Sequence, residues 1–241
     1  MKILALESTA LTASAALCEE DTLLGEITLN HGNTHSETLL PMAEFLLGQF
    51  RMKASEVGLF AVTTGPGSFT GVRIGVATVK GLAFGTKIPC AGVSALAALA
   101  DRLALSGGLI CPVMNARRNQ VYTALFRSAD GKVQRLLPDS VMSLEALQIL
   151  LTEYREPVYL CGDGYPLAMQ ALSVPLVPVP ENLRLPSAAS VARVACQMRD
   201  AGMLVSDRAL SPVYLRAPQA ERERMERLSH TKYSFTERNP K

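Results

Sequence analysis

The chain has 241 residues, an apolar fraction of 48% and a formal net charge of +2. This length allows one large domain or two modest ones with a substantial buried core. The nearly balanced charge excludes a global electrostatic attraction to nucleic acid, membranes or acidic partners, so any contact with RNA must come from a local patch or from another subunit.

The cysteines are scattered and mostly flanked by apolar residues. No CxxC pair occurs, and none of the cysteines lies near a histidine at zinc-ligand spacing, so we expect buried, reduced thiols at Cys18, Cys90, Cys111, Cys161 and Cys196. Residues 1–7 turn polar too early for a signal peptide, and no apolar run reaches the roughly 18 residues of a membrane helix. We therefore expect a cytoplasmic protein without a membrane partner.

The first half of the chain begins with three short apolar segments that predict an antiparallel meander. Behind them, Ser36 is the predicted N-cap of a helix with apolar residues at helical spacing. A strand, a glycine-rich turn, a helix to about Gly85, another strand and another helix complete this half. The predicted strands are residues 3–6, 13–18, 23–29, 59–63 and 88–93.

Strand patterning restarts after Gly107 and Gly108, which mark the predicted domain boundary. The second half has the same coarse order as the first, a meander of strands followed by helix, strand and helix, with a loop at 175–186 and a last strand at 213–215. This repetition predicts a duplicated α/β unit. The predicted organisation is a first domain at residues 1–106, a second at 107–216 and a flexible tail at 217–241.

The glycine-rich segment 65–75 reads Gly-Pro-Gly-Ser-Phe-Thr-Gly-Val-Arg-Ile-Gly. A strand that leads through such a turn into a helix is a general anion-binding arrangement, because backbone amides and the helix N-terminus can approach the ligand. The Gly-Lys-Ser/Thr of a P-loop is absent. The candidate anion-binding residues are Gly65, Gly67, Ser68 and Thr70. A tight turn that packs the helix close to its sheet is an equally open explanation.

The helix that follows carries glycines at four-residue spacing, and each interior glycine costs about 1 kcal/mol relative to alanine. Close approach of a partner helix would offset this cost, whereas packing on the chain's own sheet is the alternative. The apolar residues Val72, Val76 and Val79 can hold the helix to its sheet. The predicted partner interface comprises Gly71, Val72, Gly75, Thr78, Gly81, Leu82 and Gly85.

Other polar groups do not assemble into a catalytic or metal-binding set. Glu7 ends the first strand without a basic neighbour. His31 and His35 are four apart, but Gly32 and Asn33 should break the helical register between them, so we expect no metal. Ser68 lacks the second glycine of a nucleophile elbow, and no cysteine has an electropositive setting. We therefore predict no catalytic residue.

Arg117 and Arg118 follow a predicted strand of the second half. Guanidinium groups suit phosphate or carboxylate ligands, but a solvated turn is an equal explanation for the pair.

Several segments together resemble the bacterial TsaB (YeaZ) family. They are residues 35–41, the glycine-rich segment 65–75, residues 115–118 with Val121 and Tyr122, and residues 212–216. The resemblance spans roughly residues 1–216. Glu7 and Asn115 depart from it, because members of the family usually have aspartate at both positions.

The resemblance implies a two-lobe, actin-like and Hsp70-like (ASKHA) α/β fold. It also implies a noncatalytic, activating scaffold for the formation of tRNA threonylcarbamoyladenosine next to the anticodon, beside a TsaD-type enzyme and a TsaE-type ATPase. In that role tRNA is reached through the complex, the isolated chain needs no cofactor, and ATP or ADP enters at the level of the complex. The alternatives are an active kinase or metallopeptidase of the same fold, and a homodimeric binding module.

Overall fold

The computed structural model describes residues 1–30 and 34–216. The predicted tail at 217–241 lies outside these residues, and so does His31 of the candidate metal pair.

The first lobe is built on a five-stranded sheet whose order is β3-β2-β1-β4-β5. The first three strands form the predicted antiparallel meander, and β4 and β5 continue the sheet in parallel with β1. The strands are β1 (Lys2–Glu7), β2 (Ala13–Glu19), β3 (Thr22–Leu29), β4 (Leu59–Gly65) and β5 (Cys90–Ser94).

The second lobe repeats this arrangement. Its sheet has the order β10-β9-β6-β7-β8, which is the same succession read from the other edge, with an antiparallel meander and two parallel strands beside the first strand. The predicted duplication is therefore confirmed, and the two-lobe fold with it. The strands are β6 (Gly108–Asn115), β7 (Gln120–Ala129), β8 (Lys132–Ser143), β9 (Val158–Cys161) and β10 (Leu176–Val177).

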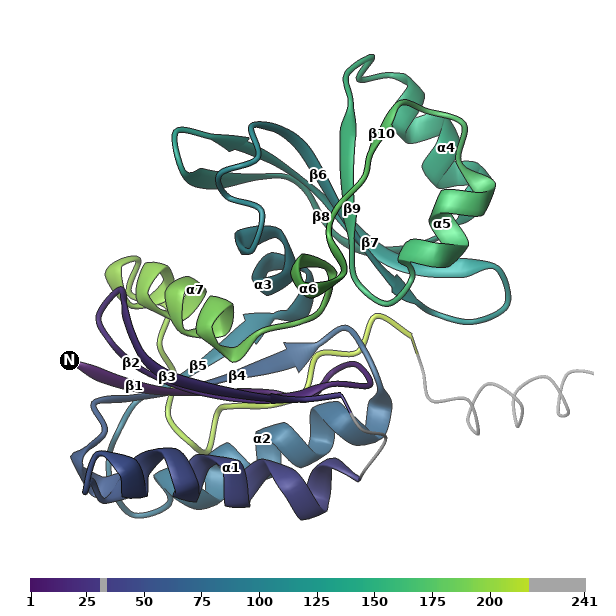
Figure 1. Ribbon diagram of the computed structural model, residues 1–241. Coiled ribbons are helices and arrows are strands. Elements are labelled where there is room, and N and C mark those ends of the chain that lie inside the picture. The colour runs from purple at the N-terminus through teal and green to yellow at the C-terminus, as the bar shows by residue number, and fades with distance from the viewer. Residues whose placement is uncertain (31–33, 217–241) are drawn as a thin grey trace, which may run out of the picture.

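The helices form layers around and between the two sheets (Figure 1). Helices α1 (His35–Gln49) and α2 (Phe69–Ala83) cover the outer face of the first sheet, and α4 (Leu144–Thr152) and α5 (Tyr165–Ala171) cover that of the second. Helices α3 (Ala95–Asp101) and α7 (Ala188–Asp200) lie between the sheets. Short turns at η1 (Ala54–Glu56) and α6 (Glu181–Arg184) complete the set. No described helix is long and apolar enough to cross a bilayer.

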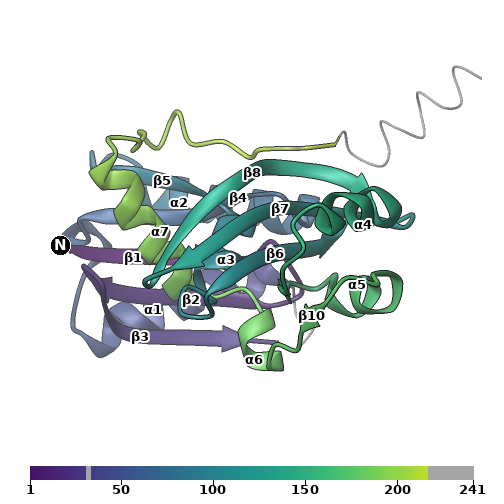
Figure 2. The same ribbon diagram turned by 90° about the horizontal axis from the view of Figure 1, so that it is seen from above.

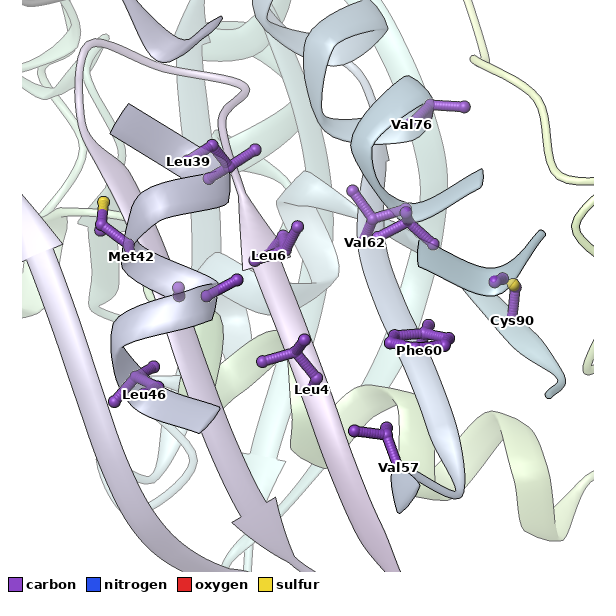
Figure 3. Packing of buried hydrophobic residues seen from close by; sticks show 14 of the residues in the cluster. Leu4, Leu6, Leu39, Met42, Leu46, Val57, Phe60, Val62, Val76 and Cys90 are labelled. Carbon is purple, nitrogen blue, oxygen red and sulfur yellow. The ribbon is translucent and has the colours of Figure 1, made fainter. Parts of the chain in front are cut away.

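Strand β1 has apolar residues on both of its faces because both faces of its sheet are covered. Leu4 and Leu6 point into the core beneath α1 and α2, whereas Ile3 and Ala5 pack on the side of α7. Figure 3 shows the first of these cores, with Leu4, Leu6, Phe60 and Val62 of the sheet beneath Leu39, Met42, Leu46 and Val76 of the helices.

Helix α3 holds the lobes together. Its Ala98 packs in the cluster of the first sheet, whereas Leu96 and Leu99 pack against the second sheet. Figure 1 shows α3 between the two sheets, and Figure 2 shows the second sheet lying over the first when the molecule is seen from above. The two sheets are thus joined by a shared apolar layer.

The end of the described chain returns to the first lobe. Helix α7 packs against β1 and β2, and Val205 exchanges two backbone hydrogen bonds with Cys90 of β5, at 2.8 and 2.9 Å. The predicted strand at 213–215 is wrong: this segment is irregular, although Val213 N–H donates to Thr64 O at 2.7 Å. The boundaries of the predicted domains stay a prediction.

The glycines of α2 do not form one exposed face. A Cβ on Gly71 would lie 2.0 Å from Ser8 O, and one on Gly75 would lie 2.5 Å from Ser8 Oγ. Val72 is buried as well. The prediction that these three residues meet a partner is corrected, because they pack on the chain's own sheet and on the turn after β1.

The remaining residues of the predicted partner interface lie toward the C-terminal end of α2. Gly81 is exposed, and a Cβ built there meets nothing within 4 Å. Gly85 follows the helix with φ +74°, a left-handed conformation that glycine adopts readily after a helix. Thr78 and Leu82 are partly buried.

This division predicts opposite effects of the same substitution along one helix. Gly71→Ala and Gly75→Ala should each lower the free energy of unfolding by about 1–3 kcal/mol or more, because the new methyl group collides with Ser8. Gly81→Ala should raise it by about 1 kcal/mol, because alanine favours the helix and meets no neighbour. Urea denaturation of the three variants measures these changes. Equal effects at Gly75 and Gly81 would contradict the packing described here.

Candidate functional site: a cleft between the lobes

A cleft of about 580 Å³ opens between the two lobes. The first lobe contributes the turn after β1 and the glycine-rich loop, and the second contributes the ends of β6 and β9. The segment that follows α7, residues 201–216, returns to the first lobe and closes one side of the cleft; it is called the returning segment below. The lining residues include Thr9, Ala10, Leu11, His35, Pro66, Gly67, Ser68, Phe69, Thr70, Asn115, Ala116, Arg117, Tyr122, Asp163, Tyr214, Leu215 and Arg216.

The glycine-rich loop approaches other backbone segments too closely for side chains. A Cβ on Gly67 would lie 2.4 Å from Thr9 O, and one on Gly65 would lie 2.4 Å from Val213 O. Ser68 N–H also donates to Thr9 O at 2.7 Å. The glycines therefore let the loop fit between the turn after β1 and the returning segment.

Of the candidate anion-binding residues, Gly67, Ser68 and Thr70 line the cleft, whereas Gly65 does not. Ser68 Oγ accepts the Gly71 N–H at 3.3 Å and caps α2. Anion binding at this loop stays a prediction.

The returning segment is fixed to the glycine-rich side by an aromatic contact. The ring of Tyr214 stacks on that of Phe69 at 4.5 Å between centroids. The Arg73 guanidinium lies 3.8 Å from the Phe69 centroid, and its Nε donates to Tyr214 Oη at 2.9 Å. Two residues further on, Arg216 Nη1 donates to Ala116 O of the second lobe at 3.2 Å.

In the second lobe, the turn between β6 and β7 faces the cleft. Arg117, Arg118 and Asn119 have φ angles of +62°, +55° and +54°. Three consecutive non-glycine residues in this region are costly and need support from their surroundings. Asp163 supplies some of that support, because its Oδ1 accepts the Asn115 N–H at 3.0 Å; burial raises the pKa of Asp163.

Glu7 and His35 both form hydrogen bonds with the turn after β1. Glu7 is fully buried and does not line the cleft; its Oε1 accepts the N–H and the hydroxyl of Thr9 at 2.6 and 2.5 Å. Burial raises the pKa of Glu7, and the bonds from Thr9 offset part of this shift. His35 lines the cleft and donates from Nε2 to Ala10 O at 2.8 Å. In residues 1–30 and 34–216, no three His, Cys, Asp or Glu side chains group to hold a metal.

The cleft unites the four segments that carry the family resemblance. His35, the loop from Gly67 to Thr70, the turn from Asn115 to Arg117 and the end from Val213 to Arg216 all line it. The sequence does not indicate that Tyr214 lies beside Phe69 or Arg216 beside Ala116, because neither contact leaves a periodic or spacing signal.

Comparisons with known proteins agree with this geometry. The family model of TsaD, the tRNA N6-adenosine threonylcarbamoyltransferase, matches residues 22–165. The tRNA threonylcarbamoyladenosine biosynthesis protein TsaB of Bacillus subtilis is 36% identical over 71% of this chain and 75% of its own length. TsaB of Escherichia coli is 30% identical over 90% of this chain and 95% of its own length. The crystallised YeaZ from Pseudomonas aeruginosa is 28% identical, with a TM-score of 0.78, over 89% of this chain and 99% of its own.

The duplicated sheets and the cleft between them define a two-lobe α/β protein of the actin-like class. Within that class, the chain belongs to the TsaB family of tRNA threonylcarbamoyladenosine biosynthesis proteins.

The buried carboxyl group of Glu7 predicts a distinctive dependence of stability on pH. Its folded pKa lies above the ordinary value of 4.5, so the folded state holds more protons than the unfolded state above that pH. The free energy of unfolding therefore falls as the pH rises from 4.5 through the raised pKa. Glu7→Gln keeps an oxygen for Thr9 but removes the titration, so its stability should depend less on pH than that of the wild type.

Urea denaturation of both proteins from about pH 4.5 to about pH 8 tests this. The difference in stability should move in favour of Glu7→Gln as the pH rises. A constant difference over the whole range would contradict a raised pKa.

Proposed function

We propose that this chain is a noncatalytic, activating scaffold subunit in the formation of tRNA threonylcarbamoyladenosine next to the anticodon, acting with a TsaD-type enzyme and a TsaE-type ATPase. The observation that carries this proposal is an exposed, partly apolar face on α1 and α2, in a chain whose relatives are named for this pathway.

The state of the reactive groups supports a role without catalysis. Glu7 is sealed in the first lobe and Asp163 is engaged with a backbone amide. Burial raises the pKa of the Cys18 and Cys90 thiols to about 11 and that of Cys111 to about 12, so these cysteines are poor nucleophiles at neutral pH. These are poor settings for general acid-base or nucleophilic chemistry.

The proposed partner surface is the outward side of α1 and of the C-terminal half of α2. Phe45 and Phe84 are 58% and 77% exposed, and Leu40 is exposed on α1 as well. On α2 itself, Ala77 and Gly81 are exposed and small, so they leave the helix backbone accessible. Large apolar side chains beside small residues let a partner helix approach closely. The surface thus comprises Leu40, Phe45, Ala77, Thr78, Gly81, Leu82, Phe84 and Gly85.

The partner proposed for this surface is the TsaD-type enzyme. The TsaE-type ATPase and tRNA then join through the assembled complex, and ATP or ADP acts at that level. In the absence of the enzyme, the same apolar face would serve a homodimer, and the two associations would compete.

The isolated chain should catalyse neither ATP hydrolysis nor peptide cleavage. Peptide cleavage is worth testing because a similar structure from Pseudomonas aeruginosa is described by its similarity to a peptidase. Purified protein should give no turnover above buffer in either assay. Activity that co-purifies with the chain and is lost in Glu7→Gln or His35→Ala would overturn the noncatalytic assignment.

Gly81→Leu should obstruct the partner surface and leave the fold intact. The side chain enters open space in the isolated chain but occupies the place of an approaching helix. Steric misfits of this kind cost about 1–3 kcal/mol, which corresponds to roughly five- to 150-fold weaker binding of the TsaD-type enzyme. Calorimetric titration measures the affinity, and circular dichroism checks the fold.

The matched control is Ala146→Leu, which adds a similar side chain to an exposed position of α4 in the other lobe. It should leave the affinity for the enzyme unchanged. Unchanged binding by Gly81→Leu, or equal losses in both variants, would place the partner surface elsewhere.

A further inference from the structure

Positive charge is concentrated along α2 and the loop that follows it. Residues 57–100 include Arg73, Lys80 and Lys87 but no aspartate or glutamate. Arg73 and Lys80 are seven positions apart on α2, so they lie on one side of the helix, about two turns from each other. Lys87 is exposed in the loop that joins α2 to β5. This region is therefore basic in a chain whose formal net charge is only +2.

The returning segment brings a further positive charge to the same side of α2. Lys80 Nζ donates to Arg208 O at 3.2 Å, so the two residues are neighbours. An antiparallel bridge joins Cys90 to Val205. Lys87 precedes this bridge by three residues and Arg208 follows it by three, so both residues lie beyond the same end of it. These positions define a basic row that comprises Arg73, Lys80, Lys87 and Arg208.

Contacts within the first lobe hold two members of the basic row in place. The guanidinium of Arg73 lies 3.8 Å from the centroid of the Phe69 ring, and its Nε donates to Tyr214 Oη at 2.9 Å. This hydrogen bond uses one of the five guanidinium donors. Lys80 donates to two carbonyl oxygens of the returning segment and keeps its full charge. Both cations are therefore positioned before a ligand arrives, which lowers the entropy cost of binding.

Acidic side chains border the basic row without neutralising it. Asp207 precedes Arg208 and offsets one of the charges. Glu37 and Glu44 are exposed on α1. Helix α1 packs over β2 and β3, α2 packs over β4, and the returning segment runs beside β5, so α2 separates these glutamates from the returning segment (Figure 2). The row thus stays basic on the side of α2 that faces away from α1.

We propose that the basic row binds the phosphate backbone of RNA. Exposed lysine and arginine side chains bind RNA by neutralising phosphates and releasing counterions, which needs no particular base sequence. The ring of Tyr214, which is 41% exposed beside Arg73, adds an aromatic surface of the kind on which unpaired bases stack. The proposal rests on the proposed function for the identity of the RNA as a tRNA, and it adds that this chain contacts the tRNA directly.

The probe is a fluorescently labelled, unmodified tRNA transcript, titrated with the isolated full chain at about 50 mM salt and followed by fluorescence anisotropy. The transcript should bind, and the logarithm of the binding constant should fall linearly with the logarithm of the salt concentration. Arg208→Glu and Lys87→Glu should each weaken binding about tenfold at this salt concentration, because each phosphate contact contributes about 0.7–0.9 to the slope of that line.

The matched control is Lys132→Glu, which makes the same charge change at an exposed position of β8 in the other lobe. It should bind the transcript as the wild type does, and thermal unfolding should show that all variants are folded. The proposal is overturned if the wild type does not bind the transcript, or if Lys132→Glu loses as much affinity as Arg208→Glu and Lys87→Glu. Binding of phosphatidylserine vesicles without binding of the transcript would also overturn it and would assign the basic row to a membrane surface.

The two proposals are tested separately. The titration of the TsaD-type enzyme against Gly81→Leu contains no RNA, so its outcome bears on the proposed function alone. The titration of the tRNA transcript contains no enzyme, so its outcome bears on the direct contact alone.

Discussion

The close approach of the glycine-rich segment to the turn after β1 is the contact on which the cleft depends. Carbonyl oxygens of Ser8 and Thr9 lie where the Cβ atoms of Gly71 and Gly67 would otherwise be. Because backbone meets backbone here, α2 lies low against its sheet and its first turn opens into the space between the lobes. This packing inside the first lobe offsets the free-energy cost of placing several glycines in a helix.

The returning segment adds the third layer to this contact. After α7 the chain runs back along β5, and Lys80 Nζ donates to the carbonyl oxygens of Arg208 and Leu210 at 3.2 and 3.0 Å. It then passes Gly65 and ends its described path at Arg216 against the second lobe. One wall of the cleft is thus formed by residues that lie about 150 positions from the glycine-rich loop in the sequence.

The sequence predicted the sheets well, because strands buried on both faces read as short apolar runs and the meander is local. It predicted that Val72, Val76 and Val79 hold α2 to its sheet, and all three are buried there, but it did not predict that Gly71 and Gly75 are covered as well. Valine at positions 72, 76 and 79 identified one apolar stripe, but Gly71 and Gly75 lie on its border, where only the position of Ser8 decides that they are covered. The start of α1 was placed two residues late, because the residue that precedes the helix is Thr34 rather than Ser36, and Thr34 makes no side-chain cap.

The site was less predictable than the fold, since its decisive contacts join segments distant in sequence. The resemblance to a family named the right segments but not their meeting point. Only the structure shows that Tyr214 covers Phe69 and that Arg216 reaches Ala116. Glu7, for which the sequence indicated no basic neighbour, is buried and does not line the cleft, and its carboxyl group accepts the Thr9 N–H.

The two copies of the repeated unit share a topology but differ on their outer faces. Helices α1 and α2 have 15 residues each, whereas α4 and α5 have 9 and 7. The longer pair provides room for two surfaces on one helix: the first turn of α2 lines the cleft, and its last turns, roughly 20 Å away at 1.5 Å per residue, reach the outer face. Glycine serves both ends for different reasons. At the start of α2, the missing side chain lets the chain's own backbone pack against the helix. Near the end, it leaves the helix backbone exposed. Substitutions at the two ends therefore separate the role of α2 in internal packing from its role at the surface.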